Sequence, residues 1–595
     1  MSAIQQLLTN HIDIWTAADT AKKSGRGRSS GTAGSVYGIK KLRELILELA
    51  VRGKLVPQDE NDEPASELLK RIAAEKAKLV AEGKIKKSKP LAEIMDDEKP
   101  FDLPVGWEWV FLPDVSEYKV GKTPSTKSSV YWTNSGDGFN WVSIADLNHD
   151  GSVFETTKQI TDKAVSEVFR YEPAPVGTIL MSFKLTLGKI STLEVPAFHN
   201  EAIISIYPNQ SIFKDYLFKV LPARAMAGNS KSAIKGNTLN SESIAALMIP
   251  LPPIAEQHRI VAKVDELMAL CDQLENQHNN AAVAHEKLVT HLLGTLTQSQ
   301  NAEDFNSHWQ RISEHFDTLF TNEASIDVLK QTLLQLAVMG KLVPQDPNDE
   351  PASELLKRIQ AEKAKLIAEG KIKKDKPFAE ITEEEKPFEL PVGWAWVQWY
   401  DILANDDAAF KRGPFGSSLT KSMFVKSGYK VYEQYCPIND DCSFERYYIT
   451  TDKFEDMKGF AVKSGDYLVS CSGVTLGRIT QIPKDFKEGI INQAILRVRI
   501  NHRYYDKDFF KLLFRSQFFQ KQIFDNSTGS AIPNVKGVKD LKVMPIPLFT
   551  VEEQSRIVAK VDELMAICDQ LKSRLTAANQ LQQKLADVLV EQAVN

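Results

Sequence analysis

A glycine-led run of hydroxyl and ammonium donors occupies residues 121–127, which read Gly-Lys-Thr-Pro-Ser-Thr-Lys. Its donor side chains are Lys122, Thr123, Ser125 and Lys127. Because glycine lets the backbone approach a ligand closely, such a run could contact phosphates and hydrogen-bond to the edges of bases. A solvated surface loop accounts for the same composition, so both interpretations stay open.

A second donor run lies at the corresponding place later in the chain. It spans residues 411–421 and contains Lys411, Arg412, Ser417, Ser418 and Lys421. Further on, residues 529–536 resemble residues 228–237 in kind, since both stretches combine glycine with hydroxyl and amide side chains. Each run alone indicates nucleic-acid contact no better than it indicates a solvated loop.

Catalytic and metal chemistry is not indicated. The run at 121–123 ends like a phosphate-binding loop, but the position of the first glycine of that motif holds Ser116. The adjacent prolines Pro252 and Pro253 lack the Asn or Asp before and the aromatic residue after them that a DNA methyltransferase needs. The cysteines lack the paired spacing of a zinc site. We therefore predict a non-enzymatic chain with no cofactor and no metal ligands.

The elements that must position these runs belong to a tandem duplication. Residues 53–110 recur as residues 340–397, so that Gly53 corresponds to Gly340, and residues 254–274 recur as residues 550–571. The stretches between the repeated blocks, 107–250 and 394–547, have largely diverged. We call the repeated blocks the frame and the stretches between them the inserts. A constant frame with variable inserts indicates two recognition domains, or readers, on one scaffold.

Helical patterns dominate the frame. Apolar residues at helical spacing predict a helix that ends before Gly53, and Pro64 and Gly83 bracket a second one. From Ile254 and from Thr550, spacings of four and three residues predict two long helices, with Leu288 and Leu585 continuing their apolar seams. Pairing of these helices as a coiled coil is favoured over their packing on the globular domains alone. Cys271 and Cys568 fall on the apolar stripe as small hydrophobes.

The inserts carry short β-like runs bounded by turns, at 177–183, 188–195 and 202–208 and again at 465–471, 477–483 and 494–500. The predicted fold class is therefore mixed α+β, with two globular domains joined by a pair of long antiparallel coiled-coil helices. The predicted segments are a flexible extension (1–38, a linker or a basic arm), a first helical block (39–106), a first insert (107–250), a first long helix (254–300), a connector with the second block (301–393), a second insert (394–547) and a second long helix (550–595).

Composition limits the choice of partner and compartment. The net charge is −5, yet the second insert carries five more Lys and Arg than Asp and Glu, while the first is nearly balanced. Nucleic acid is therefore admissible as a partner. Five cysteines without a disulfide pattern suit a reducing compartment, and no secretory signal or membrane span is evident, so we expect a cytoplasmic protein without membrane contact.

Several short motifs, each present twice and in the same order, resemble the specificity subunit of Type I restriction-modification systems. They are Leu-Pro-x-Gly-Trp-x-Trp at 103–109 and 390–396, the two donor loops, Thr-Leu-Gly-Lys/Arg-Ile at 186–190 and 475–479, and the opening of each long helix. This resemblance covers nearly the whole chain. It implies that each insert is a target recognition domain reading half of an asymmetric, two-part DNA target, and that the helices set the spacer.

The resemblance also implies partners and reading residues. The partners would be double-stranded DNA, two modification (methyltransferase) subunits that use S-adenosylmethionine, and restriction or translocase subunits that use ATP and Mg. Reading of bases favours Arg, Lys, Asn and Gln. The expected DNA-binding residues are Lys122, Thr123, Ser125, Lys127, Lys184, Lys189 and Asn237 in the first insert and Lys411, Arg412, Ser417, Ser418, Lys421, Gln434, Arg478, Asn534 and Lys536 in the second.

Partner docking and two rival functions complete the expectations. Leu68, Leu69 and Ile72, with Leu355, Leu356 and Ile359, would form the docking faces, unless they pack within each repeat. One rival is a tandem protein-binding scaffold without DNA sequence specificity, which predicts no salt-dependent DNA affinity. The other is a self-sufficient methyltransferase, which would need a cofactor loop that the sequence does not show.

Overall fold

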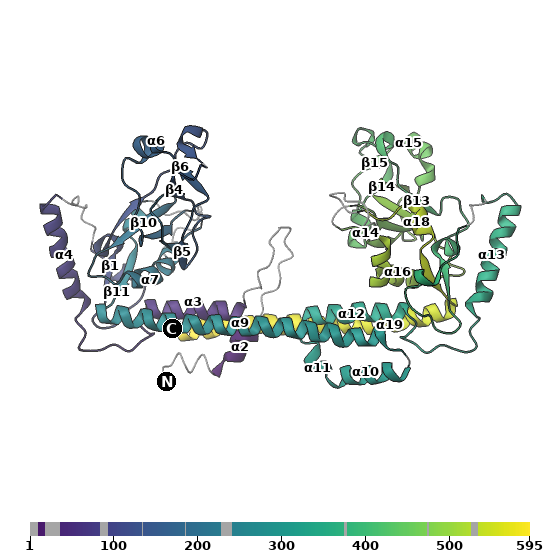
Figure 1. The fold of residues 1–595 in the computed structure, drawn as a ribbon, viewed down its shortest axis with the longest axis horizontal. Coiled ribbons are helices and arrows are strands. Elements are labelled where there is room, and N and C mark those ends of the chain that lie inside the picture. The colour runs from purple at the N-terminus through teal and green to yellow at the C-terminus, as the bar shows by residue number, and fades with distance from the viewer. Residues whose placement is uncertain are drawn as a thin grey trace. The chain divides into compact units, whose positions relative to one another are not determined.

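The computed structural model describes residues 10–17, 36–83, 93–133, 135–184, 186–227, 241–300, 302–373, 378–472, 475–524 and 534–594 (Figure 1). The chain divides into two compact units, of which unit 1 comprises residues 1–281 and 578–595 and unit 2 comprises residues 282–577. Each unit contains one repeated block, one insert and a segment of each long helix, so the predicted mixed α+β class is confirmed.

The frame of unit 1 begins with the short helix α2 (Ile12–Ala17), which packs on α3 (Tyr37–Val51). Helix α4 (Ala65–Ala81) follows, with Pro64 at its N-cap, and Gly83 takes the positive φ of 69° that a helix-ending glycine allows. Strand β1 (Glu108–Phe111) leads into the insert and pairs antiparallel with β11 (Met248–Leu251), which leads out of it. This two-stranded ribbon ties both ends of the insert to the frame.

The insert of unit 1 contains two sheets. The five-stranded sheet has the order β2-β10-β7-β8-β5, formed by β2 (Ser116–Val120), β5 (Gly151–Val153), β7 (Ile179–Ser182), β8 (Ile190–Leu193) and β10 (Ile203–Pro208). The four-stranded sheet has the order β3-β6-β4-β9, formed by β3 (Trp132–Thr133), β4 (Phe139–Val142), β6 (Lys158–Ile160) and β9 (Ala197–His199). Helices α5 (Leu112–Val115), α6 (Asp162–Ala164), α7 (Lys214–Ala227) and α8 (Ser241–Ala245) complete it.

Unit 2 repeats this plan after an additional helical segment, α10 (Ala302–Glu314) and α11 (Phe316–Leu319). Its frame helices are α12 (Glu323–Val338) and α13 (Ala352–Ala368), and β12 (Ala395–Gln398) pairs antiparallel with β20 (Pro545–Leu548) as β1 pairs with β11. Equivalent residues of the two frames are separated along the chain by the same number of residues as Gly53 and Gly340. The frame is therefore the same structure built twice.

The insert of unit 2 keeps the central strands of the first. Its larger sheet has the order β13-β19-β16-β17, and its smaller sheet has the order β15-β14-β18. The strands are β13 (Phe410–Arg412), β14 (Tyr429–Tyr432), β15 (Tyr448–Ile449), β16 (Tyr467–Ser470), β17 (Ile479–Gln481), β18 (Gly489–Ile491) and β19 (Ile495–Val498); the helices are α14 (Tyr435–Asn439), α15 (Thr451–Asp456), α16 (Lys507–Arg515), α17 (Gln517–Ile523) and α18 (Val538–Lys542). The six predicted β-runs correspond to β7, β8, β10, β16, β17 and β19.

The long helices are α9 (Ile254–Gln298), with 45 residues, and α19 (Val551–Val594), with 44. In unit 1, Lys54 Nζ donates to Val594 O at 2.8 Å and Tyr37 donates to Asp587, so α3 runs parallel to α19. Arg43 and the Val36 amide bond to residues 272–275 in the reverse sense, so α3 runs antiparallel to α9. The α9 and α19 segments of this unit are therefore antiparallel, as predicted.

The apolar seam of the long helices departs from the expected register in their second halves. Leu288 and Leu585 were expected to continue the seam but are 50% and 44% exposed. Val289 and Ala586 are buried instead. A straight helix drifts from a strict heptad repeat, and α3 and α12 widen the face that must be covered, so the seam moves by one residue. Cys271 and Cys568 are buried in the seam, as predicted.

A buried carboxylate fastens each frame to its long helix. Glu256 of α9 accepts a hydrogen bond from the Trp107 indole nitrogen at 2.9 Å and from the Gln58 amide at 3.1 Å. Glu553 of α19 accepts the equivalent bonds from Trp394 at 3.0 Å and Gln345 at 3.4 Å. We call these two arrangements the carboxylate clasps. They account for the presence of the Gly-Trp motif and of the Glu at the start of the long helix in both repeats.

Candidate DNA-binding surfaces

Both donor loops start where an edge strand leaves its sheet. In unit 1 the Gly121 amide donates to Ile203 O at 3.2 Å, and in unit 2 the Gly413 amide donates to Ile495 O at 2.9 Å. A Cβ atom at either glycine would overlap a neighbouring segment of the same insert, at His199 and Asn200 in unit 1 and at Asn492 in unit 2. Glycine is therefore required by close packing at the start of each loop.

In unit 1 the first two donors of the loop are engaged within the chain. Lys122 Nζ donates to Val168 O at 2.8 Å and Phe169 O at 3.3 Å, and the Thr123 hydroxyl donates to Glu201. These bonds hold the loop against the four-stranded sheet. They also mean that Lys122 must exchange two carbonyl contacts for any contact with a phosphate or a base.

The remaining predicted residues of unit 1 are spread over the insert. Ser125 and Lys127 are exposed. Lys189 is half-buried and donates to Ile144 O at 3.1 Å, while Lys184 lies 5.3 Å from the ring centre of Phe183. Asn237 lies outside the described residues, as do the basic residues of 18–35. In the described part of this insert the predicted residues do not form a common hydrogen-bonded cluster.

Unit 2 brings three predicted residues together. Arg412 Nη2 donates to Asn534 Oδ1 at 3.3 Å, and Asn534 forms an isolated β-bridge with Ser472. Gln434 Nε2 lies 2.9 Å from both the backbone and side-chain oxygens of Ser472. We call these four residues the Arg412 cluster. All four come from segments more than 20 residues apart in sequence, and only the fold unites them.

The guanidinium of Arg412 is incompletely satisfied. Its Nε atom is buried and has no hydrogen-bond partner among the described residues. Its guanidinium carbon lies 5.3 Å from the ring centre of Phe415, which is 62% exposed. The Phe415 ring and the Asn534 amide thus contact a guanidinium whose fork of donors is of the kind that suits guanine or phosphate.

The other predicted residues of unit 2 differ in accessibility. Ser417, Ser418, Lys421 and Arg478 are exposed, and Lys536 is half-buried. Lys411 lies on β13 beside Arg412, with its Nζ 4.3 Å from the Phe460 ring centre. Burial lowers the pKa of Lys411, and the positive charge of Arg497 lowers it further. Lys411 thus supports the sheet, whereas Arg412 faces the cluster.

Ser472 is the member of the cluster that sequence reasoning missed. It follows the buried Cys471, just beyond the end of β16, and lies three positions before the first residue of the Thr-Leu-Gly-Arg-Ile motif. That motif turns at Gly477, whose amide donates to Ser470 O at 2.8 Å, as Gly188 does to Ser182 O in unit 1. The repeated motif was a sufficient signal to mark the turn, but not to identify the serine beside it.

The predicted docking leucines require a correction. Leu68 and Ile72, with Leu355 and Ile359, are at most 3% exposed and belong to the cores of their own units. They lie one helical turn apart and face inward because their helices pack on α5 and on the start of the insert. The packing alternative therefore describes these four residues. Leu69 and Leu356 are half-buried at the edge of the same cores.

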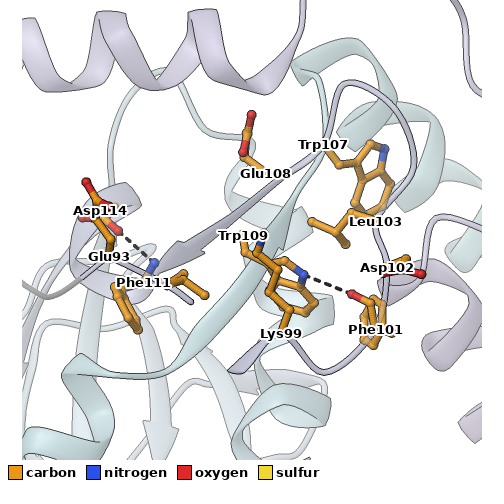
Figure 2. A pocket seen from close by; sticks show the side chains of 11 residues that line it. Glu93, Lys99, Phe101, Asp102, Leu103, Trp107, Glu108, Trp109, Phe111 and Asp114 are labelled. Carbon is orange, nitrogen blue, oxygen red and sulfur yellow. Dashed lines mark hydrogen bonds between the residues drawn. The ribbon is translucent and has the colours of Figure 1, made fainter. Parts of the chain in front are cut away.

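Each frame also contains a pocket, built from equivalent residues. In unit 1 it measures about 560 Å³, and its walls include Phe101, Trp109 and the carboxylates Asp102 and Glu108 (Figure 2). The Trp109 indole nitrogen donates to Phe101 O at 3.2 Å, drawn in Figure 2. The counterpart in unit 2 measures about 1000 Å³ and includes Phe388, Trp396 and Glu389. Carboxylates repel phosphate, which makes these pockets poorly suited to contact the DNA backbone.

None of the helices in the described part of the chain is long and apolar enough to cross a membrane. Its side chains also include no group of three or more His, Cys, Asp or Glu residues arranged to hold a metal ion. The described side chains of the inserts and the frame pockets offer hydrogen bonds and charges.

Comparison with known proteins agrees with this organisation. Residues 104–283 match the family described as "Type I restriction modification DNA specificity domain". The EcoAI and EcoEI specificity subunits of Escherichia coli are 40% and 39% identical to the chain, each over 100% of both chains. A solved structure described as the HsdS subunit from Thermoanaerobacter tengcongensis aligns with 84% of this chain and 98% of its own, at 17% identity and a TM-score of 0.35. Identity of 40% along the entire length shows that the chain belongs to the Type I restriction enzyme specificity subunits, which are non-catalytic chains carrying DNA target recognition domains.

Proposed function

We propose that the two inserts read two different blocks of one asymmetric DNA target. The observation that carries this proposal is that both inserts share the same central strand order, β2-β10-β7-β8 and β13-β19-β16-β17, but present different side chains at the equivalent loop. Lys122 and Thr123 follow the glycine in unit 1, whereas Pro414 and Phe415 follow it in unit 2. The same scaffold with different donors recognises different bases.

In unit 2 the Arg412 cluster is the proposed base-reading centre. Arg412 supplies paired donors, which suit the two acceptors of guanine, and Gln434 and Asn534 supply the amides that suit adenine. The exposed Ser417, Ser418, Lys421 and Arg478, with Lys536, are proposed to contact the phosphates that fix the register of the reader. In unit 1 the same proposal rests on Lys122, Thr123, Ser125, Lys127, Lys184, Lys189 and Asn237.

Helices α9 and α19 are proposed to set the gap between the two blocks. At about 1.5 Å per residue, 45 residues extend about 68 Å, which is long enough to link readers on separate turns of a duplex. The antiparallel sense of the two helices matches a tandem repeat in which each helix follows its own reader.

Protein partners are proposed to dock on the repeated frame rather than on the inserts. The pockets beside Trp109 and Trp396 and the edge leucines Leu69 and Leu356 occur once in each unit, as two copies of one modification subunit require. Those subunits would bring S-adenosylmethionine, and restriction subunits would bring ATP and Mg. Reversing the charge of exposed Asp102 and Glu389 to Lys should then weaken assembly stepwise, one partner per change. Matched reversals at exposed Glu172 and Asp452 on the inserts should leave it intact.

Selection from a randomised duplex library tests the proposal for DNA. The purified chain, alone and with its co-expressed modification subunit, is incubated with the library, and the retained duplexes are sequenced. Two unlike short blocks at one fixed gap are expected. A protein-binding scaffold would give no enrichment in either sample, and its retention of DNA would not fall with salt.

A further inference from the structure

Each unit docks a short frame helix along a long helix through charged side chains. In unit 1 the Arg43 guanidinium of α3 lies 2.7 Å from Asp272 and 2.7 Å from Glu275 of α9. The Val36 amide also donates to Glu275, at 3.3 Å. A positive side chain on the short helix thus meets two carboxylates on the long one.

In unit 2 part of this pattern is kept and part is reversed. Lys330 of α12 lies 2.5 Å from Asp569 of α19, which repeats the Arg43–Asp272 pair. Beside it, Lys572 of α19 lies 2.9 Å from Asp327 and 3.7 Å from Glu323 of α12. Here the long helix is positive and the short helix is negative.

The reversal occurs at equivalent positions of the repeat. Glu275 corresponds to Lys572, since Glu256 corresponds to Glu553, and Lys40 and Val36 correspond to Asp327 and Glu323. A second difference lies further along, where Tyr37 donates to Asp587 at 2.8 Å but Ala324 and Thr290 take these places in unit 2. The two docking faces therefore carry different charge patterns.

Most other contacts of the short helices distinguish the two faces little. Most buried residues of α3 are repeated in α12 as identical or similar apolar residues, except that Ser325 and Thr332 replace Gly38 and Leu45. The long helices repeat their buried residues in the same way. The equivalent apolar pairs are Ile39 and Ile326, Leu42 and Leu329, Ile46 and Leu333, Leu49 and Leu336, Val264 and Val561, Leu267 and Leu564, and Cys271 and Cys568. The carboxylate clasps are also the same. Apolar packing alone would accept α3 or α12 on either long helix.

We propose that the reversed charges at Glu275 and Lys572 form a pairing code that directs α3 to α9 and α12 to α19. If α3 took the place of α12 beside Asp569 and Lys572 of α19, Arg43 would meet Lys572 in place of Glu275. If α12 lay on α9, Asp327 would meet Glu275 in place of Lys572. Each wrong combination brings like charges together and removes an ion pair, which disfavours it without weakening either correct pair.

The occupant against which the code discriminates is a repeat of this same chain, either the other half of one molecule or a second copy. Duplicated sequences are prone to exchange equivalent elements during folding, because the wrong contacts are nearly as favourable as the right ones. The code acts where the two repeats would otherwise be interchangeable. It goes beyond the DNA-reading proposal and does not depend on it.

Substitutions in the full-length chain that give both docking faces the same charges test the inference. We call these the equalised variants. The variant Glu323→Gln, Asp327→Lys, Lys572→Glu gives unit 2 the charges of unit 1 while keeping a local ion pair. After unfolding and refolding, a carbodiimide forms amide bonds between neighbouring lysines and carboxylates, and mass spectrometry identifies them. Cross-links from Lys40 or Lys41 to Asp569, which report α3 in the place of α12, should rise about three- to fivefold, as expected when one repulsion becomes an attraction.

A matched control changes the same kind of pair without equalising the code. Lys560→Glu with Glu563→Lys inverts an exposed ion pair within α19 that takes no part in the code and keeps Asp569. The wrong cross-links and the oligomers seen by light scattering should therefore stay at the wild-type level. The milder variant Glu275→Gln, Lys572→Gln removes the reversal without new charge and should show a smaller rise. Wild-type levels of wrong cross-links in both equalised variants would overturn the inference.

Discussion

At the scale of single residues, chemical type alone identified several donors but not their availability. Lys122 and Thr123 are used to hold the loop of unit 1, whereas Arg412 keeps a buried Nε without a partner among the described residues. The difference arises because Lys122 reaches carbonyls of a neighbouring segment, and Arg412 is held between a ring and an amide. Arg412 makes one hydrogen bond with a described side chain, to Asn534, and is the side chain that we propose for recognition in unit 2.

Replacing Arg412 by Ala should weaken binding only at the DNA block that unit 2 reads. A bidentate contact with a base discriminates by about 1–3 kcal/mol, or roughly 5- to 150-fold in affinity. Titration of duplexes that carry each block in intact or scrambled form measures the effect. Lys421→Ala, which removes an exposed charge, should weaken binding to all duplexes more evenly. A fall in affinity for the block read by unit 1 would contradict the assignment.

The carboxylate clasps offer a residue-scale prediction of pH dependence. Burial raises the pKa of Glu256 and of Glu553, and hydrogen bonds from Trp107 and Trp394 oppose the rise. Because the folded protein binds these protons more tightly than the unfolded chain, the stabilising effect of protonation is complete below the unfolded pKa near 4.5 and is lost as the pH rises through the folded pKa.

The variant Glu256→Gln, Glu553→Gln removes both titrating groups and retains an oxygen that can accept a hydrogen bond. The midpoint of thermal unfolding, measured from pH 4 to pH 8, should therefore fall less with rising pH in the variant than in the wild-type protein. Each single variant should show about half of the change, since the two clasps are equivalent. Parallel curves for all four proteins would show that the clasps do not titrate in this range.

At the scale of elements, the frame helices and the insert strands follow from local patterns. Pro64 and Gly83 bracket α4, and the repeated Thr-Leu-Gly turn leads into β8 and β17. The seam of the long helices was less predictable, because Val289 and Ala586 replace the expected Leu288 and Leu585 in the core. A third helix in each unit decides which stripe is covered, and periodicity does not reveal that helix.

Seven residues inserted into α9 after Ala281 and into α19 after Ala577 should lengthen the gap in the DNA target. Two turns preserve the apolar register and add about 10.5 Å, or about three base pairs at 3.4 Å each. Selection with the lengthened chain should return the same two blocks with a wider gap. An insertion in one helix alone should instead lower the melting temperature. Beyond the insertion, each apolar residue of the lengthened helix would face a position two turns away from its usual partner on the other helix. Altered blocks at the original gap would refute the role of the helices.

At the scale of the whole molecule, the charge balance differs between the two inserts. The second has five more Lys and Arg than Asp and Glu, while the first is nearly balanced. Much of the acidity lies in the frame, including the pockets beside Trp109 and Trp396. This division agrees with our proposal that the inserts contact phosphates and the frame docks the partners.

The affinity of the assembled protein for its target should fall steeply as salt rises, because cationic side chains release counterions from the phosphates. Substituting Lys421 and Arg478 by Gln should reduce the slope of log affinity against log salt by about one for each phosphate that is no longer neutralised. Equivalent removal of frame lysines Lys70 and Lys357 serves as the control and should leave the slope unchanged. Equal effects in both variants would indicate diffuse attraction rather than contacts by the inserts.

The sequence by itself determined the duplication, the helices of the frame, the β-runs of the inserts and the family, because all of these are local or repeated patterns. Tertiary structure alone decided which donors meet. Arg412, Gln434, Ser472 and Asn534 come from four separate segments that converge only when the sheet of unit 2 forms. It likewise decided that Leu68 and Ile72 face the core, since an amphipathic stripe does not reveal whether its own chain or a partner covers it.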